Sequence, residues 1–184
     1  MTSKLPNRLH HTAYVTKDLE KTCAFYEDVL GIPLVATWCE TDFLFGADRT
    51  YCHCFFGLGD GSALAFFQFA DPEDQKLFDP ELEPSPFRHI ALHVDAETQD
   101  QMAARIAAAG YVEPDTFVLE HGYCRSLYIT DPNGMILEFT VDAPGAEQIN
   151  ADRREDAHRE LKRWLAGDHT TNNNYRHADA EAAE

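Results

Sequence analysis

The sequence predicts an α+β fold made of two βαβββ modules, followed by a C-terminal helix. Three observations lead to this prediction: the chain repeats itself, helical and strand-like spacings alternate in the same order in both halves, and a segment rich in proline and acidic residues separates the halves. With 184 residues, the chain suits one compact domain or two small modules that share a core.

The repeat has two parts. The segment His10–Val15, followed by Asp18, resembles Arg88–Asp95, and placing His11 on His89 gives an offset of 78 residues. Residues 51–56 resemble residues 123–128 at an offset of 72, and each segment precedes a turn that ends in glycine and then an apolar strand. Both halves therefore contain the same elements in the same order.

Each half begins with a strand, which an amphipathic helix follows. The first helix follows apolar spacing from Leu19 to Leu30 and ends at Gly31; the second begins near the caps Asp95 and Thr98 and ends at Gly110. Three strands complete each half, at residues 34–38, 51–56 and 62–68 in the first half and at residues 116–119, 123–128 and 135–140 in the second.

The domain boundaries follow from composition. The modules span about 5–69 and 87–142, and residues 70–86 form an exposed linker, since prolines withhold backbone donors from sheets. Residues 1–146 thus form one paired-module domain. Residues 147–184 comprise a helix from about 148 to 166, with Trp164 on its apolar face, and a polar tail.

Composition excludes several classes of function. The formal net charge of −17 repels phosphate backbones and anionic lipid headgroups, so neither nucleic acid nor a membrane is an expected partner. No apolar run approaches the roughly 20 residues that span a bilayer. The five irregularly spaced cysteines indicate reduced thiols and a cytoplasmic protein.

Three side chains at repeat-matched positions suggest a metal site: His11, His89 and Glu138. Glu138 interrupts an apolar strand, and a buried carboxylate requires a partner. Two imidazoles and one carboxylate form the non-haem Fe(II) arrangement, which leaves open positions for substrate and O₂. Taken singly, each could instead be a locally hydrogen-bonded or exposed side chain. His10 is the alternative to His11, but the repeat places His10 opposite Arg88.

These residues identify a family resemblance. The chain resembles the vicinal oxygen chelate superfamily, which includes glyoxalase I, fosfomycin-resistance proteins, bleomycin-binding proteins and type I extradiol ring-cleavage dioxygenases. The resemblance covers about residues 7–142 and implies that the paired βαβββ modules form an incomplete barrel around a metal site. The C-terminal helix and the tail lie outside it.

One stretch resembles the extradiol dioxygenases most closely, because its spacing matches their signature at His121, Tyr128, Asp131, Pro132, Gly134 and Glu138. That resemblance implies that His11, His89 and Glu138 bind Fe(II), or less often Mn(II). It implies that Tyr128 donates a hydrogen bond to a metal-bound substrate oxygen and that His121 lies at the pocket rim. The alternatives are a tyrosine that closes the barrel and a loop histidine.

The implied function is cleavage of a catecholic aromatic substrate with O₂, but two positions depart from the pattern. The dioxygenases carry an additional acid–base histidine, not itself a metal ligand, near the position of Ser62; His53 is a poor substitute, because the offset of 72 places it opposite Arg125, on the face away from Tyr128. Glyoxalase-like members carry a fourth ligand, Glu or Gln, where this chain has Ala65, and only Gln68 lies near.

Two alternative functions remain open. A glyoxalase-like metal-dependent isomerase or lyase would require Gln68 or another residue as the fourth ligand. A metal-free protein that binds an aromatic compound, like the bleomycin-binding members, would not need three converging ligands. The resemblance also makes a homodimer an expected assembly.

Overall fold

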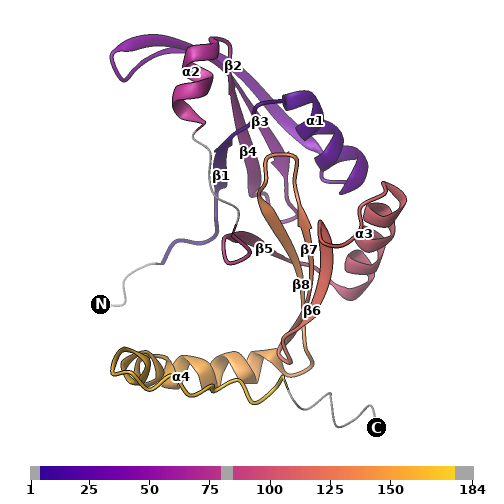
Figure 1. Cartoon of the computed structure of the whole chain (residues 1–184), viewed down its shortest axis with the longest axis vertical. Coiled ribbons are helices and arrows are strands. Elements are labelled where there is room, and N and C mark those ends of the chain that lie inside the picture. The colour runs from indigo at the N-terminus through magenta and orange to yellow at the C-terminus, as the bar shows by residue number, and fades with distance from the viewer. Residues whose placement is uncertain (1–4, 80–84, 177–184) are drawn as a thin grey trace. The chain divides into compact units, whose positions relative to one another are not determined.

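The computed structural model describes residues 5–79 and 85–176 and confirms the α+β class. The chain divides into two compact units, one made of residues 1–88, 105–110 and 130–135, the other of residues 89–104, 111–129 and 136–184. The elements, shown in Figure 1, are β1 (His11–Val15), α1 (Leu19–Cys23), η1 (Ala24–Val29), β2 (Leu34–Leu44), β3 (Ala47–Gly57), β4 (Ala63–Phe69), α2 (Pro72–Phe78), β5 (His89–His93), α3 (Ala96–Ala108), β6 (Thr116–Glu120), β7 (Cys124–Thr130), β8 (Ile136–Asp142) and α4 (Ala146–Leu165).

The first unit contains a four-stranded sheet in the order β1-β4-β3-β2. Strand β1 runs parallel to β4, with His11 opposite Ala63 and Ala13 opposite Ala65. Strand β3 runs antiparallel to β4, with Phe55 opposite Ala65. Because side chains alternate between the two faces of a strand, these residues share one face of the sheet.

The helix after β1 covers the opposite face. It was expected to be a single α-helix, but its second half is π-helical, with Leu30 N donating to Phe25 O over 3.1 Å. The wider turn brings two consecutive aromatic side chains, Phe25 and Tyr26, into the core, at 2 % and 0 % exposure. Tyr26 stacks on Phe56 with ring centroids 4.9 Å apart.

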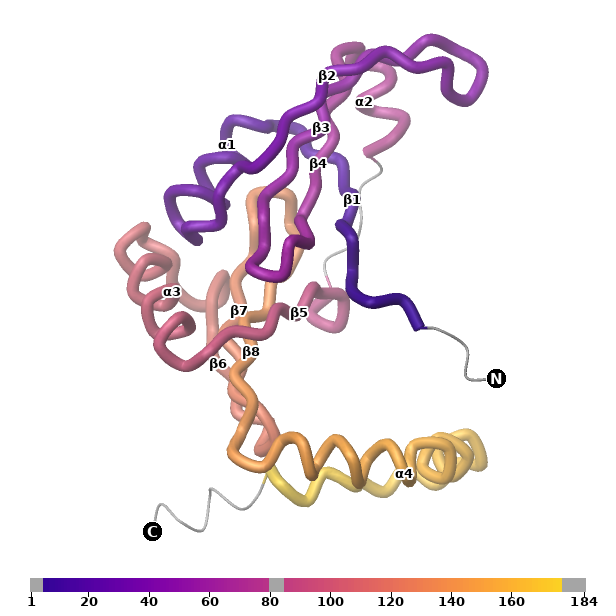
Figure 2. Tube along the Cα trace, turned by 180° about the vertical axis from the view of Figure 1, so that it is seen from behind, coloured from indigo at the N-terminus to yellow at the C-terminus, as the bar shows by residue number. Residues whose placement is uncertain are grey.

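Two features of this unit differ from the prediction. The strand expected at 34–38 continues to Leu44, because it pairs along its length with β3 in a hairpin that turns at Phe45 and Gly46, both at positive φ. The segment expected to be a linker contains α2, which Pro72 can begin because the first helical turn needs no amide donor there; Asp71 caps it. Figure 2 shows α2 beside the hairpin. Pro80 and Pro84 of the expected linker lie outside the described residues.

The second unit contains a sheet in the order β5-β8-β7-β6. Its pairing repeats that of the first, since β5 runs parallel to β8 with Ala91 opposite Glu138. Helix α3 begins after Asp95, whose carboxylate accepts from Thr98 N over 2.7 Å, as expected for a cap. Gln99 of α3 is 1 % exposed and joins the helix to the sheet, because its Nε2 donates to the Phe139 carbonyl over 2.6 Å.

Helix α4 spans nearly the expected range. The chain after it runs back along the helix, where Arg163 donates to the Thr170 carbonyl over 2.7 Å and Asn172 donates to Glu160 over 3.0 Å. Trp164, on the predicted apolar face, is 55 % exposed. Residues 177–184, the end of the expected tail, lie outside the described residues. In the part of the chain that the structure describes, no helix has the length and apolar character of a membrane span.

Candidate metal centre

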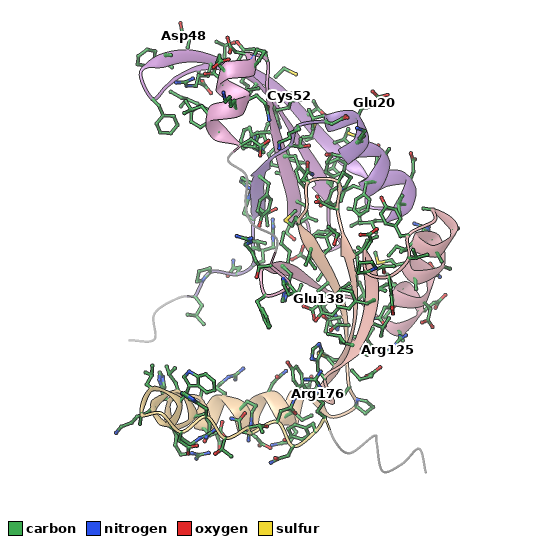
Figure 3. All side chains as sticks on the ribbon, in the orientation of Figure 1. Glu20, Asp48, Cys52, Arg125, Glu138 and Arg176 are labelled. Carbon is green, nitrogen blue, oxygen red and sulfur yellow. The ribbon has the colours of Figure 1, made fainter. Side chains whose placement is uncertain are left out.

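The centre of the second unit is a contact between a histidine and a carboxylate on parallel strands. His89 at the start of β5 lies two residues before Ala91, the register partner of Glu138, so both side chains emerge on one face of the sheet. The Nε2 atom of His89 lies 2.9 Å from Glu138 Oε2. Figure 3 labels Glu138 on β8. Two of the three predicted ligands therefore meet in one place.

Glu138 is held as a carboxylate although it is only 7 % exposed. Burial raises the pKa of Glu138, but hydrogen bonds from Ser126, Thr140 and Tyr128 and the nearby His89 lower it further, so the net shift is downward. Thr140 Oγ1 donates to Glu138 Oε1 over 2.9 Å. An ionised carboxylate beside an imidazole nitrogen is a donor set that divalent metal ions accept.

Tyr128 lies between the pair of His89 and Glu138 and the predicted rim residue, His121. Its ring lies perpendicular to that of His89, with centroids 5.9 Å apart, and its hydroxyl oxygen lies 3.1 Å from His121 Nε2. Phe117 stacks on it with centroids 4.8 Å apart. Burial, followed by the hydrogen bond to Glu138, raises the pKa of Tyr128 to about 12, so the hydroxyl remains a proton donor at neutral pH.

His11, the third predicted ligand, belongs to the first unit. Its Nδ1 lies 2.7 Å from Nδ1 of His10, an arrangement that leaves Nε2 for a ligand and gives His10 an orienting role. Within the ranges 5–79 and 85–176, no three His, Cys, Asp or Glu side chains form a group suited to a metal ion. Shared ligation by His11, His89 and Glu138 therefore stays a prediction.

The prediction that His53 faces away from the site position was wrong. His53 lies on the same face of the first sheet as His11, with ring centroids 6.0 Å apart. Phe55, two residues later, lies 5.4 Å from the His11 ring, as Tyr128 lies 5.9 Å from that of His89. The structural equivalent of Tyr128 is thus Phe55, at an offset of 73 rather than 72, and a slip of one residue reverses every side chain of a strand.

By the same offset, His53 occupies the place that Ser126 has in the second module. Burial, followed by the charge of His11, lowers the pKa of His53 to about 4, so its imidazole is neutral at pH 7. The Nε2 atom of His53 is buried and neither donates nor accepts a hydrogen bond within the described residues. Ala65 and Glu138 are themselves 73 residues apart in the sequence. Applying that offset to the preceding strand would have placed His53 on the face of His11.

The register of β1 with β4 shows where Ala65 lies, and a hydrogen bond shows what Gln68 contacts; both were considered as positions of a fourth ligand. Ala65 is paired with Ala13 as Glu138 is paired with Ala91, so the predicted equivalence of Ala65 and Glu138 is confirmed. Gln68 Nε2 donates to the Lys17 carbonyl over 2.9 Å. That amide is already engaged in holding β4 to the segment after β1.

A contact that the sequence did not predict lies beside His121. Asn173 Nδ2 donates to the His121 carbonyl over 3.1 Å. A Cβ atom added to Gly122 would lie 2.2 Å from the backbone of Tyr175. Gly122 also has a φ of 81°, so only glycine fits here without strain. Arg176, labelled in Figure 3, follows this contact at the end of the described tail.

Comparison with known families identifies the fold. Residues 8–139 match the family model of the Glyoxalase/Bleomycin resistance protein/Dioxygenase superfamily. The chain belongs to this superfamily. The match extends over both modules and includes all of the predicted site residues: His11, His89, His121, Tyr128 and Glu138.

Some of the curated relatives are named as lyases. The chain is 25 % identical over 142 residues to a lactoylglutathione lyase of Neisseria meningitidis serogroup A, covering 77 % of this chain and 96 % of the relative. It is 28 % identical over 131 residues to a probable lactoylglutathione lyase of Vibrio parahaemolyticus, covering 71 % and 88 %.

Two solved structures share the fold. A superfamily domain from Frankia has a TM-score of 0.54 at 18 % identity, covering 77 % of this chain and 96 % of that one. A mutant of the fosfomycin resistance protein FosX from Listeria monocytogenes, complexed with Mn(II) and a dihydroxypropylphosphonic acid, has a TM-score of 0.51 at 22 % identity, covering 73 % and 92 %.

Proposed function

We propose that the chain is a metal-dependent lyase or isomerase of the glyoxalase type. The observation that carries the proposal is the 2.9 Å contact of His89 Nε2 with Glu138 Oε2, which brings an imidazole beside an ionised carboxylate in a superfamily domain. The lyase names of the curated relatives support this reaction class over the catechol cleavage expected from the sequence.

In this proposal His11, His89 and Glu138 hold one divalent ion. Two observations support this role: Glu138 is held as a carboxylate, and the contact of His11 Nδ1 with His10 leaves Nε2 of His11 for a ligand. Imidazole and carboxylate ligands suit Mn(II), Fe(II), Ni(II) and Zn(II), and the related Listeria protein is complexed with Mn(II). When bound, the ion supplies positive charge to two neighbouring oxygens of a substrate.

The protein residues then orient the substrate. When substrate binds, the Tyr128 hydroxyl donates its hydrogen bond to a substrate oxygen instead of to Glu138, and His121 Nε2 donates to the hydroxyl oxygen. Phe117, stacked on Tyr128, holds the tyrosine ring in place. The reaction moves a proton between two adjacent carbons of a hemithioacetal and consumes no oxygen.

The test is anaerobic turnover of methylglyoxal with a panel of thiols by protein loaded with Mn(II), Ni(II), Zn(II) or Fe(II). The panel includes glutathione, neutral 2-mercaptoethanol and cationic cysteamine, because the net charge of −17 disfavours anionic substrates. We expect thioester formation that Glu138→Ala abolishes and that the exposed α4 variant His158→Gln retains. Absence of thioester with every metal and thiol would contradict the proposal.

A second candidate is extradiol ring cleavage, which one observation favours. His121 and Tyr128, the two more specific residues of the dioxygenase signature, lie within hydrogen-bonding distance, at 3.1 Å. This alternative predicts oxygen uptake and a yellow ring-opened product from a catechol panel after anaerobic loading with Fe(II). The two candidates are thus separated by their requirement for O₂.

A further inference from the structure

Three cysteine side chains lie together on one face of the β2–β3 hairpin, and the proposed reaction uses none of them. Strand β2 contributes Cys39, and β3 contributes Cys52, labelled in Figure 3, and Cys54. The Sγ atoms of Cys52 and Cys54 are 3.8 Å apart, and Cys39 is a second hydrogen-bond partner of the Cys52 thiol. All three are free thiols, so one hairpin face carries three reduced sulfur atoms.

The register of the hairpin places Cys39 directly opposite Cys52, with continuous pairing from there to the turn. The two turn residues, Phe45 and Gly46, both have positive φ, which is typical of a turn whose flanking residues exchange backbone hydrogen bonds. Because hydrogen-bonded and non-hydrogen-bonded pairs alternate from that turn, Cys39 and Cys52 form a non-hydrogen-bonded pair. Such a pair has Cα atoms about 4.5 Å apart, within the range of roughly 4.4 to 6.8 Å that a disulfide spans.

The neighbouring pairs on this face show that opposed side chains meet. Thr41 and Thr50, the next pair toward the turn, have hydroxyl oxygens 2.9 Å apart. Thr37 and Cys54, the next pair away from the turn, have Oγ1 and Sγ atoms 3.6 Å apart. A disulfide between these two contacts therefore requires rotation of side chains and no displacement of either strand.

The opposed thiols differ in their access to solvent. Cys39 is exposed, whereas Cys52 is partly buried and Cys54 is 4 % exposed. Burial, followed by the hydrogen bond with Cys54, raises the pKa of Cys52 to about 12, so this thiol stays protonated at neutral pH. An oxidant in solution therefore reaches Cys39 first, and Cys52 is in position to react with the product.

We propose that Cys39 and Cys52 form a redox-modification site, at which a hydroperoxide converts the pair into a cross-strand disulfide. The Cys39 thiolate attacks the hydroperoxide, the O–O bond breaks, an alcohol or water leaves, and Cys39 becomes a sulfenic acid. The Cys52 sulfur then attacks the Cys39 sulfur, the S–O bond breaks, and the oxygen leaves as water with the Cys52 proton.

The electrons and protons of this reaction balance. The two thiols give up two electrons and two protons, which reduce the hydroperoxide to an alcohol and water. A dithiol reverses the oxidation by thiol–disulfide exchange. The site goes beyond the proposed function and does not depend on it, because no predicted metal ligand takes part.

Trypsin distinguishes the possible pairings, since it cleaves after Arg49, between the two strands. Cys39 then lies in the peptide 22–49 and Cys52 in the peptide 50–76. The full chain is treated with one equivalent of hydrogen peroxide, and the remaining thiols are alkylated before digestion. Mass spectrometry should show the two peptides joined, with the loss of two hydrogens, and dithiothreitol should separate them.

Two variants assign the bond. The joined peptide should be lost in Cys39→Ser and should persist in Cys23→Ser, because Cys23 shares the peptide of Cys39 but lies on α1. A bond between Cys52 and Cys54 would instead stay inside one peptide. Fragment ions of the wild-type peptides identify the linked cysteines directly, so the question is decided even if a variant fails to fold.

Four results would overturn the inference. They are the absence of the joined peptide from the oxidised wild-type chain, its persistence in folded Cys39→Ser, its loss in folded Cys23→Ser, and a bond between Cys52 and Cys54 in its place. Oxidation of Cys39 to a sulfinic acid without the joined peptide counts as the first of these.

Discussion

The hydroxyl oxygen of Tyr128 lies 3.1 Å from Nε2 of His121, and the same side chain donates to Glu138. One hydroxyl thus connects the rim of the second module to its predicted ligand pair. Because the Tyr128 ring is also stacked on Phe117, the position of its hydroxyl is fixed before any substrate arrives.

Replacing Tyr128 by Phe should slow the reaction without removing the ion. The variant lacks the donor that the proposal directs at a substrate oxygen, and loss of one such donor lowers kcat by about 100-fold. Steady-state kinetics at saturating metal should show this fall, and elemental analysis should still find the bound ion. A Tyr128→Phe protein with wild-type kcat would contradict the role of the hydroxyl.

Adding the metal should stabilise the protein. A ligand that binds only the folded state at about 100 times its Kd adds about 2.7 kcal/mol to the free energy of unfolding. Thermal unfolding of metal-free protein should therefore shift upward on addition of Zn(II) or Mn(II), and Glu138→Gln should remove most of the shift. An equal shift in both proteins would indicate that the ion binds elsewhere.

A hydrogen bond inside the first unit should contribute measurably to stability. Tyr26 is fully buried and its hydroxyl donates to Asp131 over 3.1 Å, joining η1 to the turn before β8. Tyr26→Phe should lower the free energy of unfolding by about 1 to 2 kcal/mol, since it leaves a buried carboxylate with one donor fewer. Urea unfolding checks this value; no loss would mean that solvent or another donor replaces the hydroxyl.

The contact of the tail with His121 should protect the rim. Asn173→Ala removes the hydrogen bond to the His121 carbonyl and should speed amide hydrogen exchange in residues 121–123. Asn174→Ala, an exposed neighbour, is the matched control. Identical exchange in both variants would show that Asn173 does not hold the tail in place.

The internal repeat predicted most of the element order and the equivalence of Ala65 with Glu138, because helix and strand spacings are local properties of the sequence. It could not fix the π-helical turn at Phe25 and Tyr26, which depends on packing against the sheet, or the helix at Pro72, where proline begins a helix rather than excluding one.

The face of His53 was predicted wrongly for a related reason. Matching residue types gave an offset one residue too short, whereas the true offset is fixed by strand pairing, which connects distant parts of the chain. The contact of Asn173 and Tyr175 with the His121 loop was also beyond prediction, since a polar tail carries no periodic pattern.

The central claim is that His11, His89 and Glu138 bind one metal ion, and metal stoichiometry tests it most directly. Elemental analysis after loading with Mn(II) and desalting should find one ion per wild-type chain and far less in each of His11→Ala, His89→Ala and Glu138→Ala, provided that circular dichroism shows them folded. Retention of one ion per chain by all three folded variants would contradict the claim.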